Sequence, residues 1–438
     1  MNSILSNIQH SKHRRSAAIV TLNEDVYEME MLAESAGFEV KFEVIQRKVN
    51  ENASTFLGKG KLRGLKDLLS NRPVDVVLIN GDLKPKQHFN LENSLKIECL
   101  DRVGLVLLIF AEKARDKKAR LQVEKARLEY EIPLLREWIH SAKMGEHPGF
   151  LGGGEYQVDV YYDLVKRRTR KISEELRAIN IGEDIRRKHR RGKGFFLVGI
   201  AGYTNAGKSS LLNRLTGERV LVENHMFSTL STTTRRLNDV KKDVLISDTI
   251  GFIRDLPHFM IESFMTTIEA LYLSDLVLLV IDSSDPVDLI KVKLDTSIKI
   301  LLPETSPNNI IIILNKTDIA PGRVEDNIGK VGKMLPGTKV LPISLAYDWG
   351  VDALIEKIID FFSYECMMVF SIPNSSESQS FISHLYEISD VTSVKYNSEV
   401  RISIECRDKD LDTISKTIDT LHGHIISLDH RDNNHKTI

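Results

Sequence analysis

The sequence predicts an α/β protein of four parts, one of them a domain with a phosphate-binding loop (P-loop). Apolar runs alternate with helical patterns, a G-x-x-x-x-G-K-[ST] motif stands between a strand and a helix, and positive charge is concentrated in one region. The predicted parts are an N-terminal α/β domain (1–111), a basic antiparallel helical hairpin (112–193), a P-loop domain with a mostly parallel sheet (194–364) and a small C-terminal α/β domain (365–438).

Length and charge limit the class of protein. A chain of 438 residues is long enough for about three domains, and its 42% hydrophobic residues can supply their cores. A net charge of -1 excludes a protein that is basic over its whole surface. Any contact with nucleic acid must therefore come from a local patch.

Cysteine and histidine usage indicates a reducing compartment. Cys99, Cys366 and Cys406 are far apart, and neither they nor the thirteen histidines follow a metal-ligand spacing, which argues against a zinc site or a disulfide framework. The first fifteen residues lack the apolar core of a signal peptide, and no segment reaches the roughly 18 apolar residues of a membrane span. We expect a cytoplasmic monomer without a membrane span, and peripheral membrane contact stays open.

The N-terminal part alternates strand and helix patterns. Residues 17–21, 40–44, 74–79 and 105–110 predict strands, and residues 25–36 and 61–70 predict helices. The tetrapeptide at 58–61, GKGK, lacks the full P-loop pattern. We therefore interpret it as the turn that starts a helix rather than as a phosphate site.

Residues 112–193 predict a basic hairpin, with 21 lysines and arginines against 14 aspartates and glutamates. Apolar residues near helical spacing indicate two amphipathic helices. They are Leu121, Leu128, Ile132 and Leu135 in the first, and Val160, Leu164, Ile172 and Leu176 in the second. The glycine-rich segment 147–155 is expected to form the loop between them.

Two basic clusters, residues 166–171 and 186–191, lie on the second predicted helix. A basic arm with a flexible tip suits structured RNA, where phosphate contacts and shape dominate recognition. The alternative is that these charged faces are only solvated.

The P-loop motif occupies residues 202–209, GYTNAGKS, after an apolar run at 195–200 and before a helical pattern at 209–215. Its glycines let the backbone curl around phosphate groups, and the helix N-terminus adds partial positive charge. Lys208 is expected to reach the β- and γ-phosphates, and Ser209 to bind Mg²⁺ through its hydroxyl.

A second motif, DTIG at 248–251, closes the apolar run 244–247. Asp248 is therefore expected to hold Mg²⁺ through water, and Gly251 to bring its N–H to the γ-phosphate. Upstream, segment 227–235 is similar to a mobile switch in which Thr229 completes the Mg²⁺ coordination while the γ-phosphate is present.

Two further motifs predict the nucleotide base. Residues 315–318, NKTD, end the run 310–314, and residues 344–346, SLA, follow the run 340–343, so both stand at strand ends, where ligands bind parallel sheets. Asp318 can accept from the ring N–H and the exocyclic amine of guanine, a pair of donors that adenine lacks. Four motifs in this order predict a GTP-binding P-loop GTPase domain.

Two residues refine this prediction. Phe252 stands where many switch GTPases carry a glutamine that orients the attacking water, so we predict slow intrinsic hydrolysis that depends on a partner or a rearranged residue. Asn205 suggests a potassium ion near the phosphates, because some GTPases with asparagine at this position depend on potassium.

The predicted cofactors are GTP or GDP, Mg²⁺ and, as a further hypothesis, K⁺. Lys208, Thr229 and Gly251 are the predicted catalytic residues, and Ser209, Thr229 and Asp248 the predicted Mg²⁺ ligands. The predicted nucleotide contacts are Gly202, Tyr203, Thr204, Asn205, Ala206, Gly207, Lys208, Ser209, Ser210, Phe227, Ser228, Thr229, Leu230, Ser231, Asp248, Thr249, Ile250, Gly251, Asn315, Lys316, Thr317, Asp318, Ser344, Leu345 and Ala346.

The C-terminal part carries no recognisable chemistry. Residues 373–380 are polar and rich in serine, which predicts a linker, and residues 370–429 predict short strands and two helices in a small α/β domain.

Over roughly residues 40–365 the chain resembles the HflX family of ribosome-associated GTPases. The resemblance rests on segments 202–209, 227–235 and 248–252, and upstream on Asn90-Leu91-Glu92, Asp101-Arg102, Ile109-Phe110-Ala111 and Leu121-Gln122-Val123-Glu124. Two segments depart from the family pattern. Ser231-Thr232 replaces the usual aspartate and proline, and residues 152–155, GGGE, lack the usual arginine and proline.

The resemblance implies a GTPase that binds the large ribosomal subunit, with its N-terminal and helical parts reaching ribosomal RNA, and that acts in ribosome splitting, rescue or biogenesis. Two alternatives stay open from the residues. One is an RNA chaperone or unwinding module driven by the N-terminal region, and the other is a GTPase that regulates a protein or membrane complex.

Overall fold

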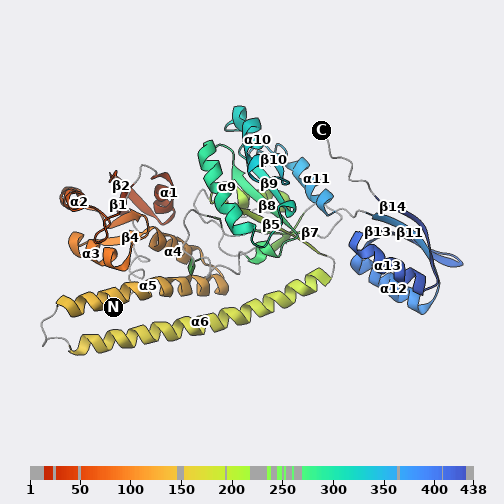
Figure 1. The fold of residues 1–438 in the computed structure, drawn as a ribbon, viewed down its shortest axis with the longest axis horizontal. Coiled ribbons are helices and arrows are strands. Elements are labelled where there is room, and N and C mark those ends of the chain that lie inside the picture. The colour runs from red at the N-terminus through yellow and green to blue at the C-terminus, as the bar shows by residue number, and fades with distance from the viewer. Residues whose placement is uncertain are drawn as a thin grey trace. The chain divides into compact units, whose positions relative to one another are not determined.

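The computed structural model describes residues 14–22, 26–47, 51–145, 152–192, 195–217, 234–237, 244–248, 251–252, 259–260, 269–362, 366–406 and 408–430. These residues form three separate β-sheets and one helical hairpin (Figure 1). Within the described part of the chain, no helix is both long enough and apolar enough to cross a membrane.

The N-terminal sheet is parallel, with strand order β2-β1-β3-β4. Its strands are β1 (Arg15–Thr21), β2 (Phe38–Ile45), β3 (Val76–Asn80) and β4 (Glu98–Asp101), and its first helices are α1 (Tyr27–Ser35), α2 (Lys59–Asn71) and α3 (Pro85–Leu95). The strands predicted at 17–21, 40–44 and 74–79 and both predicted helices are confirmed. Gly58 is the N-cap of α2, so the turn at 58–61 does start a helix.

The strand predicted at 105–110 is wrong, because these residues lie in helix α4 (Arg102–Lys113). The carboxylate of Asp101 accepts a hydrogen bond from the N–H of Gly104 at 2.8 Å and so caps the helix at its start. Residues 102–110 are all buried, and residues 103–110 carry only apolar side chains or none, so this part of the helix is apolar all round. A short run of this kind has no periodicity that separates a buried helix from a buried strand.

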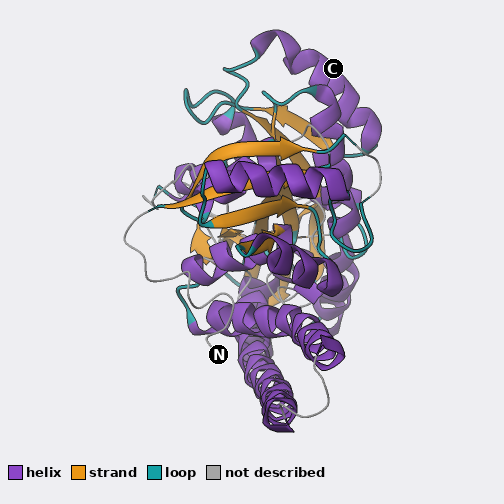
Figure 2. Cartoon of the chain, turned by 90° about the vertical axis from the view of Figure 1, so that its left-hand side faces the viewer, coloured by secondary structure: helices purple, strands orange, loops and turns teal. Residues whose placement is uncertain are grey.

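Helices α5 (Lys117–Gly145) and α6 (Gly152–Gly192) run side by side as the predicted hairpin (Figure 2). Leu121 of α5 packs against Ile172 and Leu176 of α6. The guanidinium of Arg168 donates to both carboxylate oxygens of Glu124, at 2.6 and 2.8 Å, and so joins the two helices. At 1.5 Å per residue, α6 is about 60 Å long.

Two expectations for the hairpin are wrong. Val160 and Leu164 are 50% and 60% exposed, so these two residues do not belong to the buried apolar stripe of the second helix. Residues 152–155 belong to α6 and not to a loop. The remaining loop residues, 147–151, lie outside the described residues.

The central sheet has six strands in the order β10-β9-β8-β5-β7-β6, and β10, β9, β8 and β5 pair in parallel. Its strands are β5 (Phe196–Gly202), β6 (Thr234–Arg236), β7 (Val244–Asp248), β8 (Leu276–Asp282), β9 (Ile310–Asn315) and β10 (Lys339–Pro342). Its helices are α7 (Lys208–Thr216), α9 (Val287–Leu301), α10 (Val324–Met334) and α11 (Val351–Phe361), with short 3-10 helices at Pro307–Asn309 and Pro321–Arg323. The predicted P-loop fold is confirmed.

The C-terminal domain is a βαββαβ unit with an antiparallel sheet in the order β12-β13-β11-β14. Its elements are β11 (Cys366–Pro373), α12 (Ser376–Ile388), β12 (Asp390–Tyr396), β13 (Glu399–Cys406), α13 (Asp408–Thr420) and β14 (His424–His430). The linker predicted at 373–380 is wrong. Ser375 instead caps α12, where its hydroxyl accepts from the N–H of Ser378.

Candidate nucleotide site

The loop between β5 and α7 has a backbone that only glycine allows at two positions. Gly202 has φ +139, and a Cβ there would lie 2.2 Å from the Val280 carbonyl oxygen of β8. Gly207 has φ +100, and a Cβ there would lie 2.2 Å from Nδ2 of Asn315. The loop is therefore pressed against the neighbouring strands, with its N–H groups at the N-terminus of α7, where anions bind.

Lys208 is held inside this loop. Its Nζ donates to the backbone carbonyl of Tyr203 at 2.7 Å, and the residue is only 8% exposed. Burial lowers the pKa of Lys208 to about 8, and the nearby charge of Asp248 partly opposes this shift. A buried ammonium group beside a glycine loop is suited to a phosphate, whose charge would favour the protonated form.

Ser209 and Asp248 form a second cluster in the site. The hydroxyl of Ser209 lies 3.5 Å from Oδ2 of Asp248, and both residues are buried. Hydroxyl and carboxylate oxygens are hard ligands, which Mg²⁺ prefers when it also contacts substrate phosphates. The residues therefore fit the predicted metal.

The backbone at Gly251 and Phe252 closes against the loop. The N–H of Thr204 donates to the Phe252 carbonyl at 2.9 Å, and the N–H of Phe252 donates to the Gly202 carbonyl at 3.0 Å. A Cβ on Gly251 would lie 2.8 Å from Nζ of Lys208 and 3.1 Å from the backbone Cα of Thr204, so glycine permits this close approach. Gly251 is thus placed beside the predicted phosphate-binding lysine.

The ring of Phe252 is part of the core of the central domain. It is 3% exposed and packs in a cluster that includes Tyr203 and Leu279. A side chain at this position points away from solvent, which agrees with the expectation that Phe252 does not position a water molecule.

Asn315 connects the loop to the predicted base-binding segments. Its Nδ2 donates to the Ala206 carbonyl at 2.9 Å, and its Oδ1 accepts from the N–H of Leu345 at 3.3 Å. The side chain is almost fully buried, at 2% exposure. One amide group therefore fixes residues from three separate motifs.

Asp318 and Ser344 meet across the predicted base site. The hydroxyl of Ser344 donates to Oδ1 of Asp318 at 2.6 Å and accepts from the N–H of Tyr347 at 3.4 Å. The hydroxyl of Thr317 donates to the Ile343 carbonyl at 2.9 Å. These contacts orient one carboxylate oxygen of Asp318, the residue predicted to accept from the base.

The remaining predicted residues fall into two groups. Ser210, Lys316 and Ala346 lie beside these contacts in the chain, and Nζ of Lys316 forms an ion pair with Asp282 at 2.6 Å. The other predicted contacts lie outside the described residues: Phe227, Ser228, Thr229, Leu230, Ser231, Thr249 and Ile250.

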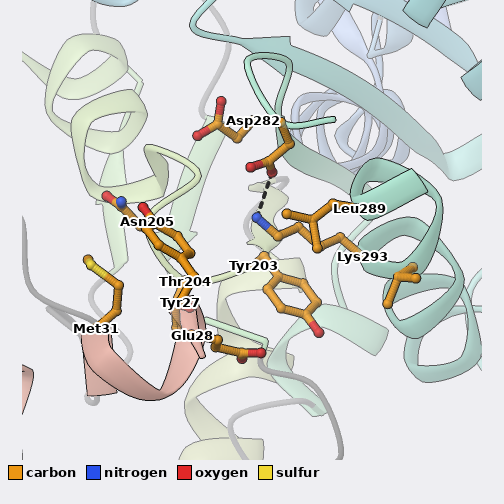
Figure 3. A pocket seen from close by; sticks show the side chains of 11 residues that line it. Tyr27, Glu28, Met31, Tyr203, Thr204, Asn205, Asp282, Leu289 and Lys293 are labelled. Atoms are coloured by element: carbon orange, nitrogen blue, oxygen red, sulfur yellow. Dashed lines mark hydrogen bonds and ion pairs between the residues drawn. The ribbon is translucent and has the colours of Figure 1, made fainter. Parts of the chain in front are cut away.

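The motifs did not predict a pocket beside the loop (Figure 3), lined by Tyr203, Thr204, Asn205, Asp282, Asp285, Leu289, Val292, Lys293 and the α1 residues Tyr27, Glu28 and Met31. Nζ of Lys293 lies 2.5 Å from Oδ2 of Asp285 and 5.5 Å from the centre of the Tyr203 ring. Burial raises the pKa of Asp285, and Lys293 opposes that shift. Neither residue belongs to a nucleotide motif, so the sequence held no signal for them.

Three family profiles match the chain. They are described as GTP-binding GTPase N-terminal over residues 23–111, GTP-binding GTPase Middle Region over 113–190, and 50S ribosome-binding GTPase over 197–316.

Curated proteins and solved structures are also similar. The GTPase HflX of Methanocaldococcus jannaschii is 37% identical over 397 residues, which cover 90% of this chain and 96% of that protein. The GTPase HflX of Thermococcus kodakarensis is 44% identical over 293 residues, which cover 67% of this chain and 66% of that protein. A crystal structure of a GTP-binding protein from the archaeon Sulfolobus solfataricus, in complex with GDP, shares 28% identity, with a TM-score of 0.46 and coverage of 79% of this chain and 98% of that one.

Proposed function

The chain belongs to the HflX family of GTPases, and from this premise we propose that it is a switch protein that associates with the large ribosomal subunit. Membership of the family makes it a GTP-binding and GTP-hydrolysing enzyme. The proposed outcome of its cycle is ribosome splitting, rescue or biogenesis. We propose that the protein acts as a monomer in the cytoplasm. We also propose that the chain has four domains, with boundaries after residues 111, 193 and 364.

The exposed basic face of α6 is the observation that carries the ribosomal proposal. Lys166, Arg167, Arg170 and Lys171 are all exposed on this helix. Positive side chains along one rigid helix can contact successive phosphates of a folded RNA. The match of residues 197–316 to the 50S ribosome-binding GTPase profile supports the same partner.

We assign roles in the nucleotide site from its geometry. Lys208 and the loop N–H groups would bind the phosphates, and the N–H of Gly251 would contact the γ-phosphate. Asp318, oriented by Ser344, would accept from the guanine base, and Asn315 would hold the two halves of the site together.

Ser209 and Asp248, with Thr229 from the switch segment, would hold Mg²⁺. The ion would supply positive charge next to the phosphate oxygens. Asn205 is one of the residues that line the pocket beside the loop (Figure 3), and it would help to hold K⁺ near the phosphates. Equal GTP turnover in potassium and sodium buffers would remove the potassium part of the proposal.

The proposal is tested by measuring GTP turnover with and without purified large ribosomal subunits from the same source. We expect clear stimulation by the subunits and salt-sensitive binding. If turnover is unchanged while GTP binding is intact, the large subunit is not the activator, and another partner must supply that role. RNA remodelling that survives Lys208→Ala, or binding to liposomes in the absence of RNA, would favour one of the two alternative functions.

A charge-reversal variant tests whether α6 makes the contact. Changing Lys166, Arg167, Arg170 and Lys171 to glutamate should weaken subunit binding and flatten its salt dependence, because fewer counterions are released. The matched control reverses the same number of exposed charges on the GTPase domain, at Lys299, Lys330, Lys333 and Lys339. Equal loss in both variants would show a general charge effect instead of a contact by α6.

A further inference from the structure

The C-terminal sheet brings three metal-ligand side chains together at one edge. Cys366 is the first residue of β11, and its register partner on the neighbouring antiparallel strand is His430, the last residue of β14. Asp408 begins α13, two positions after β13 ends at Cys406. The beginning of one strand and the ends of two others therefore place a thiol, a carboxylate and an imidazole side by side.

The ligand atoms of these side chains converge. Sγ of Cys366 lies 2.8 Å from Oδ1 of Asp408 and 3.2 Å from Nδ1 of His430, and these last two atoms are 3.3 Å apart. In a tetrahedral zinc site, bonds of about 2.0–2.3 Å place neighbouring ligand atoms about 3.3–3.6 Å apart. Two sides of the observed triangle, at 3.2 and 3.3 Å, are close to this spacing, and the third, between Sγ of Cys366 and Oδ1 of Asp408, is shorter at 2.8 Å.

This arrangement does not fit a nucleophilic Cys-His-Asp relay. In such a relay the base takes the thiol proton on one ring nitrogen, and the carboxylate binds the other nitrogen. Here the same atom, Nδ1 of His430, faces both the sulfur of Cys366 and the carboxylate of Asp408. The three ligand atoms lie within 3.3 Å of one another around one common point, where a shared cation would sit.

The surroundings of the cluster suit a metal ion that arrives from solution. Cys366 is 1% exposed, whereas the side chains of Asp408 and His430 are 64% and 56% exposed. The protein therefore covers one side of the common point, and solvent can reach the other. Water could supply the fourth ligand, as it does at zinc sites with three protein ligands.

We propose that Cys366, Asp408 and His430 form a binding site for a divalent transition metal of the zinc class in the C-terminal domain. A thiolate and an imidazole favour Zn²⁺ and similar soft or borderline ions over Mg²⁺ and Ca²⁺, which take oxygen ligands. These ligands differ from the predicted metal ligands of the nucleotide site, which are all oxygen atoms.

The proposal reverses the expectation drawn from the sequence. The cysteines and histidines follow no metal-ligand spacing because Asp408 and His430 lie 42 and 64 residues after Cys366. Because β11 pairs with both β13 and β14, the sheet brings these three distant residues close together.

The experiment is a titration of the full chain with Co²⁺, which replaces Zn²⁺ and gives a near-ultraviolet absorption band only when a thiolate binds it. GDP and excess Mg²⁺ are present throughout to occupy the nucleotide site, and a phosphine reductant keeps the thiols free. We expect the band to appear at one equivalent and to disappear when Zn²⁺ is added. Absence of the band at millimolar Co²⁺ would overturn the proposal.

Three cysteine variants locate the site, because Cys99, Cys366 and Cys406 are the only cysteines in the chain. Cys366→Ser should abolish the band, while Cys99→Ser and Cys406→Ser should leave it. Cys406 is the more stringent control, because this buried residue of β13 is the register partner of Cys366. A band that survives Cys366→Ser, or that requires either other cysteine, would contradict the assignment.

Because Cys366 is buried, Cys366→Ser could misfold, so two variants at exposed positions provide an independent test. His430→Gln and Asp408→Asn should each weaken Co²⁺ binding at least tenfold without changing the thermal unfolding midpoint in the absence of metal. The matched controls are His424→Gln and Asp390→Asn, which lie in the same domain on exposed positions. Unchanged Co²⁺ affinity in both ligand variants would leave only a hydrogen-bonded cluster and would end the proposal.

Discussion

The side chain of Asn315 donates a hydrogen bond to the backbone carbonyl of Ala206 at a distance of 2.9 Å. The two residues are 109 positions apart in the chain. Because the same amide also accepts from the N–H of Leu345, the phosphate loop and the predicted base-binding segment are fixed to one buried group. Through these two hydrogen bonds, Asn315 shapes the candidate nucleotide site independently of any direct contact with the nucleotide.

The first prediction concerns this amide. Asn315→Ala removes both hydrogen bonds, which are worth about 1–3 kcal/mol together, so the Kd for GTP should rise about 5- to 150-fold. Isothermal calorimetry measures the change, with circular dichroism to verify the fold. The exposed Asn397→Ala in the C-terminal domain is the control, and a GTP affinity equal in both variants would contradict the role of Asn315.

The second prediction concerns base selection. Asp318→Asn replaces an acceptor with an amide, so two charge-assisted hydrogen bonds to guanine are lost and GTP affinity should fall about 100-fold or more. Xanthine carries a carbonyl in place of the exocyclic amine, so the variant should prefer xanthosine triphosphate. Competition between the two nucleotides measures the preference. Asp352→Asn, an exposed change, should keep the preference for GTP.

The third prediction concerns the residue after Gly251. Because Phe252 is packed in the core, Phe252→Gln should not place an amide beside the phosphates and should not raise intrinsic GTP turnover. It should instead lower the free energy of unfolding by about 2–4 kcal/mol, since it buries a polar group in place of a ring. Denaturant unfolding and single-turnover hydrolysis measure both effects. The exposed Tyr386→Gln is the control, and faster hydrolysis by Phe252→Gln would show that the position reaches the water.

The fourth prediction concerns pH. The pKa of Lys208 is lowered to about 8 by burial, and bound phosphate charge would favour its protonated form and raise that pKa. Binding should therefore take up protons above pH 8, and GTP affinity should fall as pH rises from about 8 to 9.5, by no more than tenfold per pH unit. Calorimetry in two buffers of different ionisation enthalpy counts the protons. An affinity that is flat over this range, with no proton uptake, would contradict the prediction.

Several elements were predictable because their signals are local. Gly207 and Lys208 mark a loop and the start of a helix within a motif of eight residues. The apolar runs at 195–200 and 310–314 each end at a nucleotide motif. The fold class followed from these short patterns. Helix α4 was not predicted because α1, α5 and the first sheet cover it, which is a property of the tertiary structure. A helix covered in this way has no polar face, so its sequence shows no helical period.

The sequence by itself determined the family, the order of the nucleotide motifs and the chemistry of each side chain, because these depend only on which residues follow one another. The tertiary structure alone decided which distant groups meet. Asn315 reaches Ala206 because parallel pairing aligns the ends of β5, β8 and β9, and Cys366 reaches His430 because antiparallel pairing joins the beginning of β11 to the end of β14. Sheet register sets these neighbours, and register depends on packing across the whole domain.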